Sequence, residues 1–533
     1  MGKPSRRKRA KAKKRATRRR AAKGSDASQA DLKELQDARA LWQREQYDAA
    51  LDGFDRTLKR HPNHRLALVD AARAFGARYE IDRAEALVER SIELGRGEAN
   101  VLHLAGQSYR MMHRPDKAIM CFQRAIEADG NLADSHLELA ILYERGNRLS
   151  EARLHVDECL KLKGEYVEAQ LVKARLLRRG GEETSSENIL RDLAPNKRSH
   201  PIVRAQAWSE LSTLLDARGD YDEAFEAAVR SNRLLSQQES AVWKQSQSEL
   251  ANLCHLVETV TSGDFRRWRD AAAAWPVEPV ALLTGPPRSG TTLLEKVLDA
   301  HGQVIASDER DAFARYIFPA MLGKRESPLL GADVLEAAAT ETLLAERKRY
   351  LCYMEAALAE PLAGRLLIDK NPSTLMLAPG MLRLFPECRL LVALRDPRDV
   401  VLSCFVSYFP PNTVSVHFLT LQRTAERYVR DMQAWLKLRE IIPDGWLEVR
   451  YEDLVDDLPS TARRATDFLG LPWDDAVLTY RDRLADRQIN SPTYEAVAKP
   501  IYRSAIGRWQ NYRRPLEPVL SLLEPLVRSL GYS

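Results

Sequence analysis

A chain of 533 residues exceeds one ordinary domain, and we expect two to four domains. Its 44% hydrophobic and 29% charged residues are typical of a globular protein, and no apolar run is long enough to cross a bilayer. The six cysteines are scattered without a CxxC pair, which disfavours a metal site or a disulfide framework and favours a cytoplasmic location.

The N-terminal 30 residues form a strongly basic arm. Thirteen lysines and arginines lie within residues 3–23, which hold no acidic residue, so the net charge of +6 originates in this arm. The composition predicts disorder over residues 1–30. Such an arm favours contact with nucleic acid or another anionic surface, and the alternative is a solvated tail without a partner.

Residues 31–236 repeat with a period of 34. Small residues at this spacing let paired helices approach closely, and large apolar residues fill the gap beside them. The pattern resembles the tetratricopeptide repeat, a helix–turn–helix unit, and predicts an all-α solenoid of about six units. The two small series are Ala50, Ala84, Ala118 and Ala152, and Ala38, Ala72, Gly106, Ala140 and Ala174. The large series include Leu41, Phe75, Tyr109 and Leu177, and Phe54, Val88, Phe122, Val156 and Leu190.

The sixth unit follows a four-residue insertion and contains Ser212, Leu215, Ala224 and Ala228. Repeat arrays of this kind present a concave groove, so we expect it to bind an acceptor or partner protein. The alternatives are packing only against the second half of the chain or against a second copy in a homo-oligomer. Residues 237–276 have helical spacing and predict a capping or linker helix.

From residue 277 to residue 533 the pattern changes to that of an α/β domain. Short apolar runs typical of buried strands alternate with segments of helical spacing. This alternation predicts a parallel sheet covered by helices on both faces. The expected strands lie at 279–285, 365–369, 389–395 and 446–451.

The stretch GPPRSGTT, residues 285–292, has the form of a phosphate loop without its lysine. Gly285 and Gly290 keep the spacing of GxxxxGK[ST], but Thr291 stands at the lysine position and Arg288 lies inside the loop. Backbone N–H groups and the start of the following helix suit a phosphate.

We expect no metal beside this loop. A magnesium partner would be an acidic residue at the end of a neighbouring strand, but here Arg395 precedes Asp396. A 5′-phosphosulfate carries less charge than a triphosphate, so positioned donors can hold it without a metal ion.

The stretch PPRSGTTLLEKVLDAH is similar to the sulfotransferase family, which uses 3′-phosphoadenosine 5′-phosphosulfate (PAPS), and in particular to the tyrosylprotein sulfotransferases. The resemblance covers residues 279–510 and implies a P-loop-type sulfotransferase domain over 277–533. It implies donor binding by the loop residues Arg288, Ser289, Gly290, Thr291 and Thr292.

Two further stretches resemble donor-binding motifs of the family. In LLVALRDPRDVVLSCF an arginine and a serine lie eight residues apart, as in the family's 3′-phosphate motif, and this pair suits a phosphate dianion. The stretch KPIYRSAIGRWQNY resembles the loop that closes over the donor, with an arginine where the tyrosine enzymes carry lysine. The implied contacts are Arg395, Ser403, Tyr451, Arg503, Ser504 and Arg508.

The resemblance also implies catalytic roles. Glu309 would accept the proton of the acceptor hydroxyl, while Lys370 and Arg288 would stabilise charge on the leaving and moving groups. The family's Gly-Glu-Glu-Thr run is here residues 307–310, SDER, which leaves the surroundings of the acceptor open. The alternatives are that Glu309 caps a helix and that Lys370 is an ordinary loop lysine.

Together these patterns predict a sulfotransferase whose acceptor is a hydroxyl, on protein tyrosine or alternatively on carbohydrate or a small molecule. The repeats favour a polypeptide acceptor. Two other functions stay open, namely a P-loop kinase or NTPase and a repeat scaffold with an inactive nucleotide domain. The missing lysine argues against the first. The joint presence of Arg288, Glu309, Lys370, Arg395 and Ser403 argues against the second.

Overall fold

A computed structural model describes residues 29–44, 46–323, 329–484 and 500–533. The chain divides into two compact units, Met1–Gly130 and Asn131–Ser533. Residues 1–28, which hold nearly all of the predicted basic arm, lie outside the described residues. Within the described ranges, no helix combines the length and the apolar character that a bilayer span requires.

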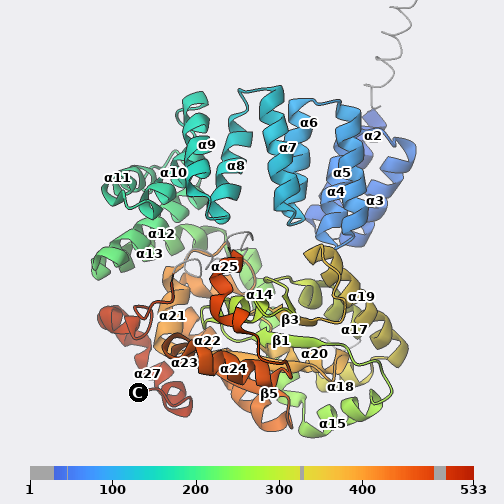
Figure 1. Ribbon diagram of the computed structural model, residues 1–533, viewed down its shortest axis with the longest axis vertical. Coiled ribbons are helices and arrows are strands. Elements are labelled where there is room, and N and C mark those ends of the chain that lie inside the picture. Colours follow the sequence, from blue (N-terminus) through green and yellow to red (C-terminus); the bar gives the residue numbers. More distant parts are fainter. Residues whose placement is uncertain (1–28, 45, 324–328, 485–499) are drawn as a thin grey trace, which may run out of the picture. The chain divides into compact units, whose positions relative to one another are not determined.

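The repeat region consists of helices packed in six pairs (Figure 1). Three pairs belong to the first unit and three to the second. The pairs are α2 (Gln29–Gln43) with α3 (Tyr47–Arg60), α4 (Arg65–Ala77) with α5 (Ile81–Gly95), α6 (Ala99–Met111) with α7 (Pro115–Ala128), α8 (Ala133–Arg145) with α9 (Leu149–Leu162), α10 (Val167–Arg179) with α11 (Glu183–Leu193), and α12 (Pro201–Arg218) with α13 (Tyr221–Leu235).

Small residues sit where the paired helices touch. Ala118 and Ala152 are fully buried, and a Cβ atom added to Gly106 of α6 would lie 2.7 Å from the Phe122 ring of α7. A larger side chain at Gly106 would therefore force the two helices apart. The period of 34 thus has the packing reason that the sequence suggested.

Two helices, α14 (Ser240–Thr259) and α15 (Ser262–Ala271), occupy the stretch where the sequence suggested a single linker helix. Val260 is extended between them, and Thr261 and Asp264 form a capping box that begins α15. The side chain of Asn232 in α13 donates to the carbonyl of Phe405 at 2.9 Å, so the last repeat packs on the α/β part of the second unit.

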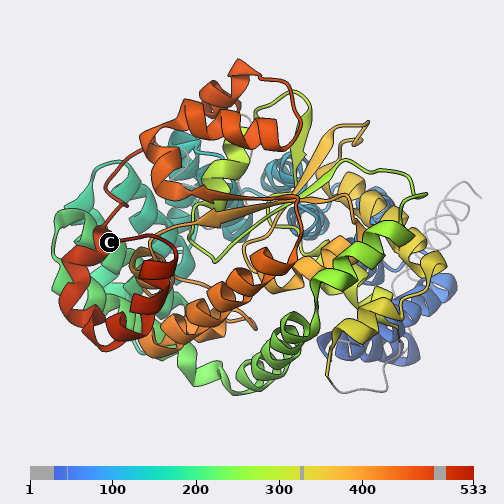
Figure 2. The ribbon, with the colours of Figure 1, turned by 90° about the horizontal axis from the view of Figure 1, so that it is seen from below.

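The α/β part is built on five parallel strands in the order β2-β3-β1-β4-β5, with helices on both sides (Figure 2). The strands are β1 (Val280–Thr284), β2 (Val304–Ala306), β3 (Leu366–Lys370), β4 (Arg389–Leu394) and β5 (Trp446–Arg450). Four of them were expected, whereas β2 has only three residues and gave too short an apolar run. A repeat solenoid followed by a parallel α/β domain is the predicted fold class, which is confirmed.

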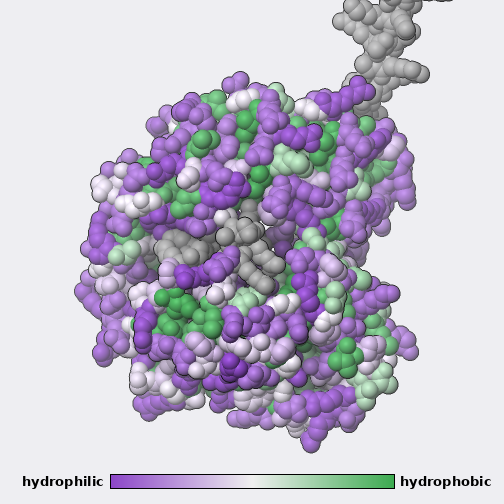
Figure 3. Space-filling model, viewed as in Figure 1, coloured by the Kyte–Doolittle hydropathy of each residue, from purple (hydrophilic) through white to green (hydrophobic). Residues whose placement is uncertain are grey.

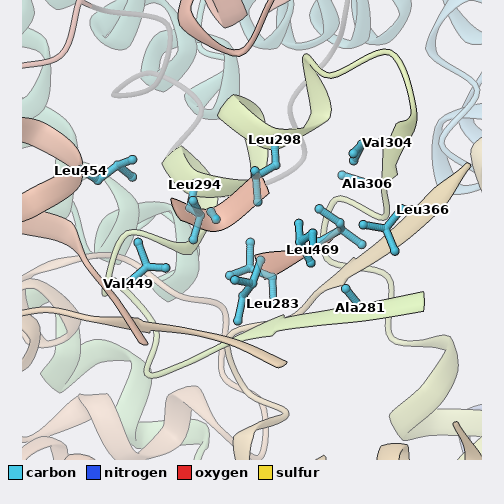
Figure 4. Packing of buried hydrophobic residues seen from close by; sticks show 13 residues of the cluster. Ala281, Leu283, Leu294, Leu298, Val304, Ala306, Leu366, Val449, Leu454 and Leu469 are labelled. Atoms are coloured by element: carbon cyan, nitrogen blue, oxygen red, sulfur yellow. The ribbon is translucent and has the colours of Figure 1, made fainter. Parts of the chain in front are cut away.

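Thirteen buried hydrophobic residues form a core between α16 and the sheet (Figure 4). Leu294 and Leu298 of α16 meet Leu283 of β1 and Val449 of β5. This packing fixes the start of α16, and with it the phosphate loop, against the sheet. On the face in Figure 3, hydrophilic residues predominate and hydrophobic ones form small separate groups.

The remaining helices of the second unit cover the sheet and follow its strands. They are α16 (Thr291–Asp299), α17 (Phe318–Leu322), α18 (Ala332–Glu336), α19 (Thr340–Leu358), α20 (Ala378–Leu384), α21 (Pro397–Val406), α22 (Leu421–Ile441), α23 (Tyr451–Asp456), α24 (Leu458–Phe468), α25 (Tyr480–Leu484) and α27 (Arg513–Ser529), with 3₁₀ turns η4 (Ser415–Leu419) and η6 (Arg508–Tyr512). Because all five strands are parallel, their carboxyl ends lie at one edge, where ligands of such sheets bind.

Candidate active site

The loop between β1 and α16 depends on glycine at two positions. Gly285 has φ +141° and Gly290 has φ +99°, values that favour glycine. A Cβ atom at Gly285 would collide with the carbonyl oxygen of Ala393, and one at Gly290 would lie 2.7 Å from Cδ2 of Tyr451. The loop therefore lies directly against β4 and the residue that follows β5, with the start of α16 at its end.

A cavity of about 350 Å³ opens at this loop. Its wall combines the phosphate loop, the ends of neighbouring strands and the C-terminal loop. Nine of the residues singled out in the sequence line it: Arg288, Gly290, Thr291, Thr292, Glu309, Arg395, Ser403, Tyr451 and Arg508. The structure thus brings together residues separated by up to 220 positions in the chain.

Three guanidinium groups face this cavity. Arg288 donates from Nε to Ser403 Oγ at 2.9 Å, and Arg395 donates to the backbone carbonyl of Arg288 at 3.2 Å and to that of Ala505. Burial, reinforced by the positive charge of Arg395, lowers the pKa of Arg288. Because like charges repel, three arginines on one small cavity favour an anionic ligand between them.

Buried polar atoms test whether an anion suits this wall. Arg395 Nε and Ser289 Oγ are buried and have no hydrogen-bond partner within the described residues. An unpartnered buried donor is costly, so a ligand with acceptor oxygens would satisfy these groups. The residues present therefore fit a donor with phosphate and sulfate groups such as PAPS.

Lys370 is fully buried at the end of β3, behind the cavity wall. Its Nζ donates to Glu309 Oε1 at 2.6 Å and lies 3.3 Å from Glu295 Oε2. Although burial lowers the pKa of Lys370, Glu295 and Glu309 outweigh this effect and raise it, so the side chain is an ammonium. The ammonium orients the carboxylate of Glu309, which itself lines the cavity.

The turn that carries Glu309 has an unusual backbone. Asp308 has φ +52° and Glu309 has φ +64°, which is uncommon for residues other than glycine. The N–H of Asp308 donates to Glu295 Oε1 at 2.9 Å, and the N–H of Glu309 donates to the Lys370 carbonyl at 3.1 Å. Lys296 also lies 3.3 Å from the Asp308 carboxylate. These contacts hold the strained turn, and with it the carboxylate of Glu309, in one place.

Glu295 is therefore a site residue that the sequence analysis missed. It is fully buried in α16, and burial raises the pKa of its carboxyl group. The only signal in the sequence was an acidic residue among the apolar positions of a helix. That signal does not reveal the lysine that arrives from β3, 75 positions further on.

Asp399 was missed as well, and it fixes the C-terminal loop. Its carboxylate accepts the N–H groups of Gly507 and Trp509, both at 2.8 Å. The Arg398 guanidinium covers the Trp509 ring at 4.1 Å. Burial raises the pKa of Asp399, while the hydrogen bonds and Arg395 lower it. The loop is thus attached to α21 and holds Arg508 at the cavity.

Two predicted donor contacts lie away from the cavity wall. Arg503 is 74% exposed and pairs with Asp456 at 2.7 Å, and Ser504 is also exposed. Ser289 is buried in the loop without lining the cavity. The roles of these three residues remain predictions.

One part of the cavity wall is apolar and had no counterpart in the sequence analysis. Phe409, Pro410, Val414 and Phe418 come from the segment between α21 and α22, and Pro372 follows β3. Their stretch, SYFPPNTVSVHF, has no regular spacing, so only the fold identifies it as part of the cavity. As for a metal, no group of three or more His, Cys, Asp or Glu side chains suited to an ion occurs in the described parts of the chain.

Comparison with known proteins places residues 279–475 in a match to the model of the sulfotransferase family. The chain is 27% identical over 269 residues to protein-tyrosine sulfotransferase A of Caenorhabditis elegans, covering 48% of this chain and 67% of that protein. It is 27% identical over 337 residues to an uncharacterized protein of Aquifex aeolicus (strain VF5), covering 62% of this chain but only 42% of that relative's length.

The repeat region is similar to a solved tetratricopeptide-repeat protein of Thermus thermophilus, with 18% identity and a TM-score of 0.29, over 34% of this chain and 98% of that one. The family model and the tyrosine sulfotransferase relative fall on the α/β part, where the sequence motifs lie. The predicted resemblance to sulfotransferases is confirmed.

Proposed function

We propose that this chain, whose residues 279–475 match the sulfotransferase family, moves a sulfuryl group from PAPS to an acceptor hydroxyl. One observation carries the proposal. The carboxylate of Glu309 lies on a cavity shared by three arginines and is held at 2.6 Å by the buried ammonium of Lys370. A base and a set of anion-binding cations therefore meet at one place.

The arginines and hydroxyls of the wall would hold the donor. Arg288 with the N-terminus of α16 suits the phosphosulfate end, and Arg395 with Ser403 suits a phosphate dianion. When bound, PAPS supplies the sulfuryl group and leaves as adenosine 3′,5′-bisphosphate. Positioned donors of this kind each contribute on the order of 3 kcal/mol to lowering a barrier.

Glu309 would accept the proton of the acceptor hydroxyl as the new sulfur–oxygen bond forms. A phenol has a pKa of about 10 and an alcohol a higher one, so a positioned carboxylate assists either acceptor. Lys370 keeps the carboxylate in place and supplies positive charge beside it. In a direct in-line transfer the acceptor oxygen attacks the sulfur atom itself, so no protein side chain needs to form a covalent intermediate.

The finer proposal is a protein tyrosine as acceptor. The relative from C. elegans is named a protein-tyrosine sulfotransferase, and the apolar wall formed by Phe409, Pro410 and Phe418 suits an aromatic ring. A repeat groove that binds a polypeptide would supply such an acceptor. We further propose a cytoplasmic location, in keeping with six free cysteines. Carbohydrate and small-molecule hydroxyls are the competing acceptors.

Calorimetry with adenosine 3′,5′-bisphosphate tests the donor. We expect binding in a buffer with chelator and without added metal, and much weaker binding of ATP. Tight binding of ATP that requires magnesium, without binding of the bisphosphate, would support a P-loop kinase or NTPase instead. Transfer of labelled sulfate from PAPS to lysate proteins, glycans and small phenols then identifies the acceptor class.

A further inference from the structure

We infer that the last repeat pair is a functional part of the donor site, because Asp216 of α12 positions Arg508 on the cavity wall. This inference rests on the proposed function, since it concerns binding of the same donor. Asp216 precedes and Arg508 follows the segment 279–475 that matches the sulfotransferase family. The contact is therefore a property of this chain outside that segment.

The two side chains form an ion pair within the second unit. Arg508 donates from Nε to Asp216 Oδ1 at 3.1 Å, and its Nη2 lies 2.9 Å from the same oxygen. Both side chains are about three-quarters buried. Although burial lowers the pKa of Arg508, the charge of Asp216 raises it. One edge of the guanidinium is thus fixed by the repeat while Arg508 lines the cavity.

Tyr512 provides a second connection to the same carboxylate. Its hydroxyl donates to Asp216 Oδ1 at 2.6 Å, and the residue is only 1% exposed. The Tyr512 ring packs on Tyr221 and Phe225 of α13, at 5.3 Å and 6.3 Å between ring centres. Asp216 and α13 therefore hold both ends of η6, the turn that begins with Arg508.

On its other side, this loop is held by Asp399 of α21 through the N–H groups of Gly507 and Trp509. Asp399 fixes the backbone, whereas Asp216 fixes the side chain of Arg508. A flexible arginine loses conformational freedom when it binds an anion, and fixing it beforehand reduces that loss. Asp216 therefore acts as a positioning residue for donor binding, and it acts through Arg508.

Calorimetry with adenosine 3′,5′-bisphosphate on the full chain tests this inference. We expect Asp216→Ala and Asp216→Asn to weaken binding about fivefold or more, and Asp216→Glu to restore part of the affinity. The Asn variant keeps the size of the side chain and an acceptor for Tyr512, so it separates the charge from the packing. Unfolding temperatures show that each variant is folded.

A double-mutant cycle supplies the decisive readout. If Asp216 acts through Arg508, Asp216→Ala should change affinity by less than about twofold in an Arg508→Ala background. Glu210→Ala is the matched control, because Glu210 lies on the same helix but pairs with Arg175 and Arg178 of the repeats. It should leave the affinity unchanged.

The outcomes are distinguishable. If the unmodified chain does not bind the bisphosphate, the proposed function fails. If the unmodified chain binds but the Asp216 variants bind equally well, the positioning role is wrong. A loss of affinity that is as large without Arg508 as with it would also overturn the inference, because Asp216 would then act by another route.

Discussion

Lys370 and Glu309 form an ion pair in which the lysine is fully buried and its Nζ lies 2.6 Å from the carboxylate oxygen. The same ammonium lies 3.3 Å from Glu295, so two carboxylates face one cation. When Glu309 accepts a proton and loses its charge, Glu295 remains as the counterion of Lys370. The pair therefore keeps its geometry while one member changes protonation state.

Replacing Glu309 tests the assignment of the base. Glu309→Gln preserves the size of the side chain but cannot accept a proton, so turnover should fall by at least about 10²-fold. The affinity for adenosine 3′,5′-bisphosphate should stay within about twofold, because the arginines hold the anion. Sulfate transfer and calorimetry measure the two quantities. Near-normal turnover in this variant would show that another group takes the proton.

Arg288 should matter for both binding and rate. Arg288→Ala removes a cation from the cavity and leaves Ser403 without its donor, so we expect weaker bisphosphate binding and a fall in kcat of about 10²-fold or more. Arg288→Lys keeps a charge without the forked geometry and should recover only part of either quantity. Unchanged affinity in the alanine variant would place the anion elsewhere.

The pH profile should report on Glu295. The charged groups that face Lys370 are Glu295 from α16 and Asp308 and Glu309 from the turn after β2, and together they raise its pKa against the effect of burial. Glu295→Gln removes one negative charge, so the pKa of Lys370 should fall. The alkaline limb of kcat/KM against pH should then move to lower pH. A purely structural role would lower the rate at every pH without moving that limb.

Asp369 predicts a pH dependence of stability. Burial raises the pKa of this carboxyl from 3.8 to about 6 in the folded chain, although Tyr350 and Ser307 donate hydrogen bonds to it. Its favourable contribution is therefore complete below the unfolded pKa and is lost as the pH rises through about 6. The change amounts to about 3 kcal/mol at most.

Asp369→Asn should remove this contribution. Denaturant unfolding at several pH values between about 4 and about 7 should give a difference between the variant and the unmodified chain that changes with pH across this window. A difference that stays constant over the whole window would mean that Asp369 keeps an ordinary pKa.

The sequence predicted the features that depend on local patterns. The 34-residue period predicted the helix pairs, and the spacing of Gly285 and Gly290 predicted the phosphate loop, because each reflects backbone geometry or close packing. Glu295, Asp399 and Asp216 were missed for one physical reason. Each acts on a residue 75 or more positions away, and only the parallel sheet and the last repeat bring the partners together.

The contact between Asp216 and Arg508 also limits how the chain can be divided and recombined. The helices up to α11 carry no residue of the cavity wall or of its direct supports described above, whereas α12 and α13 hold the C-terminal loop. A chimaera that exchanges the repeats for those of another protein should therefore be joined between α11 and α12. A junction after α13 would replace the sixth unit and remove the carboxylate on which the orientation of Arg508 depends.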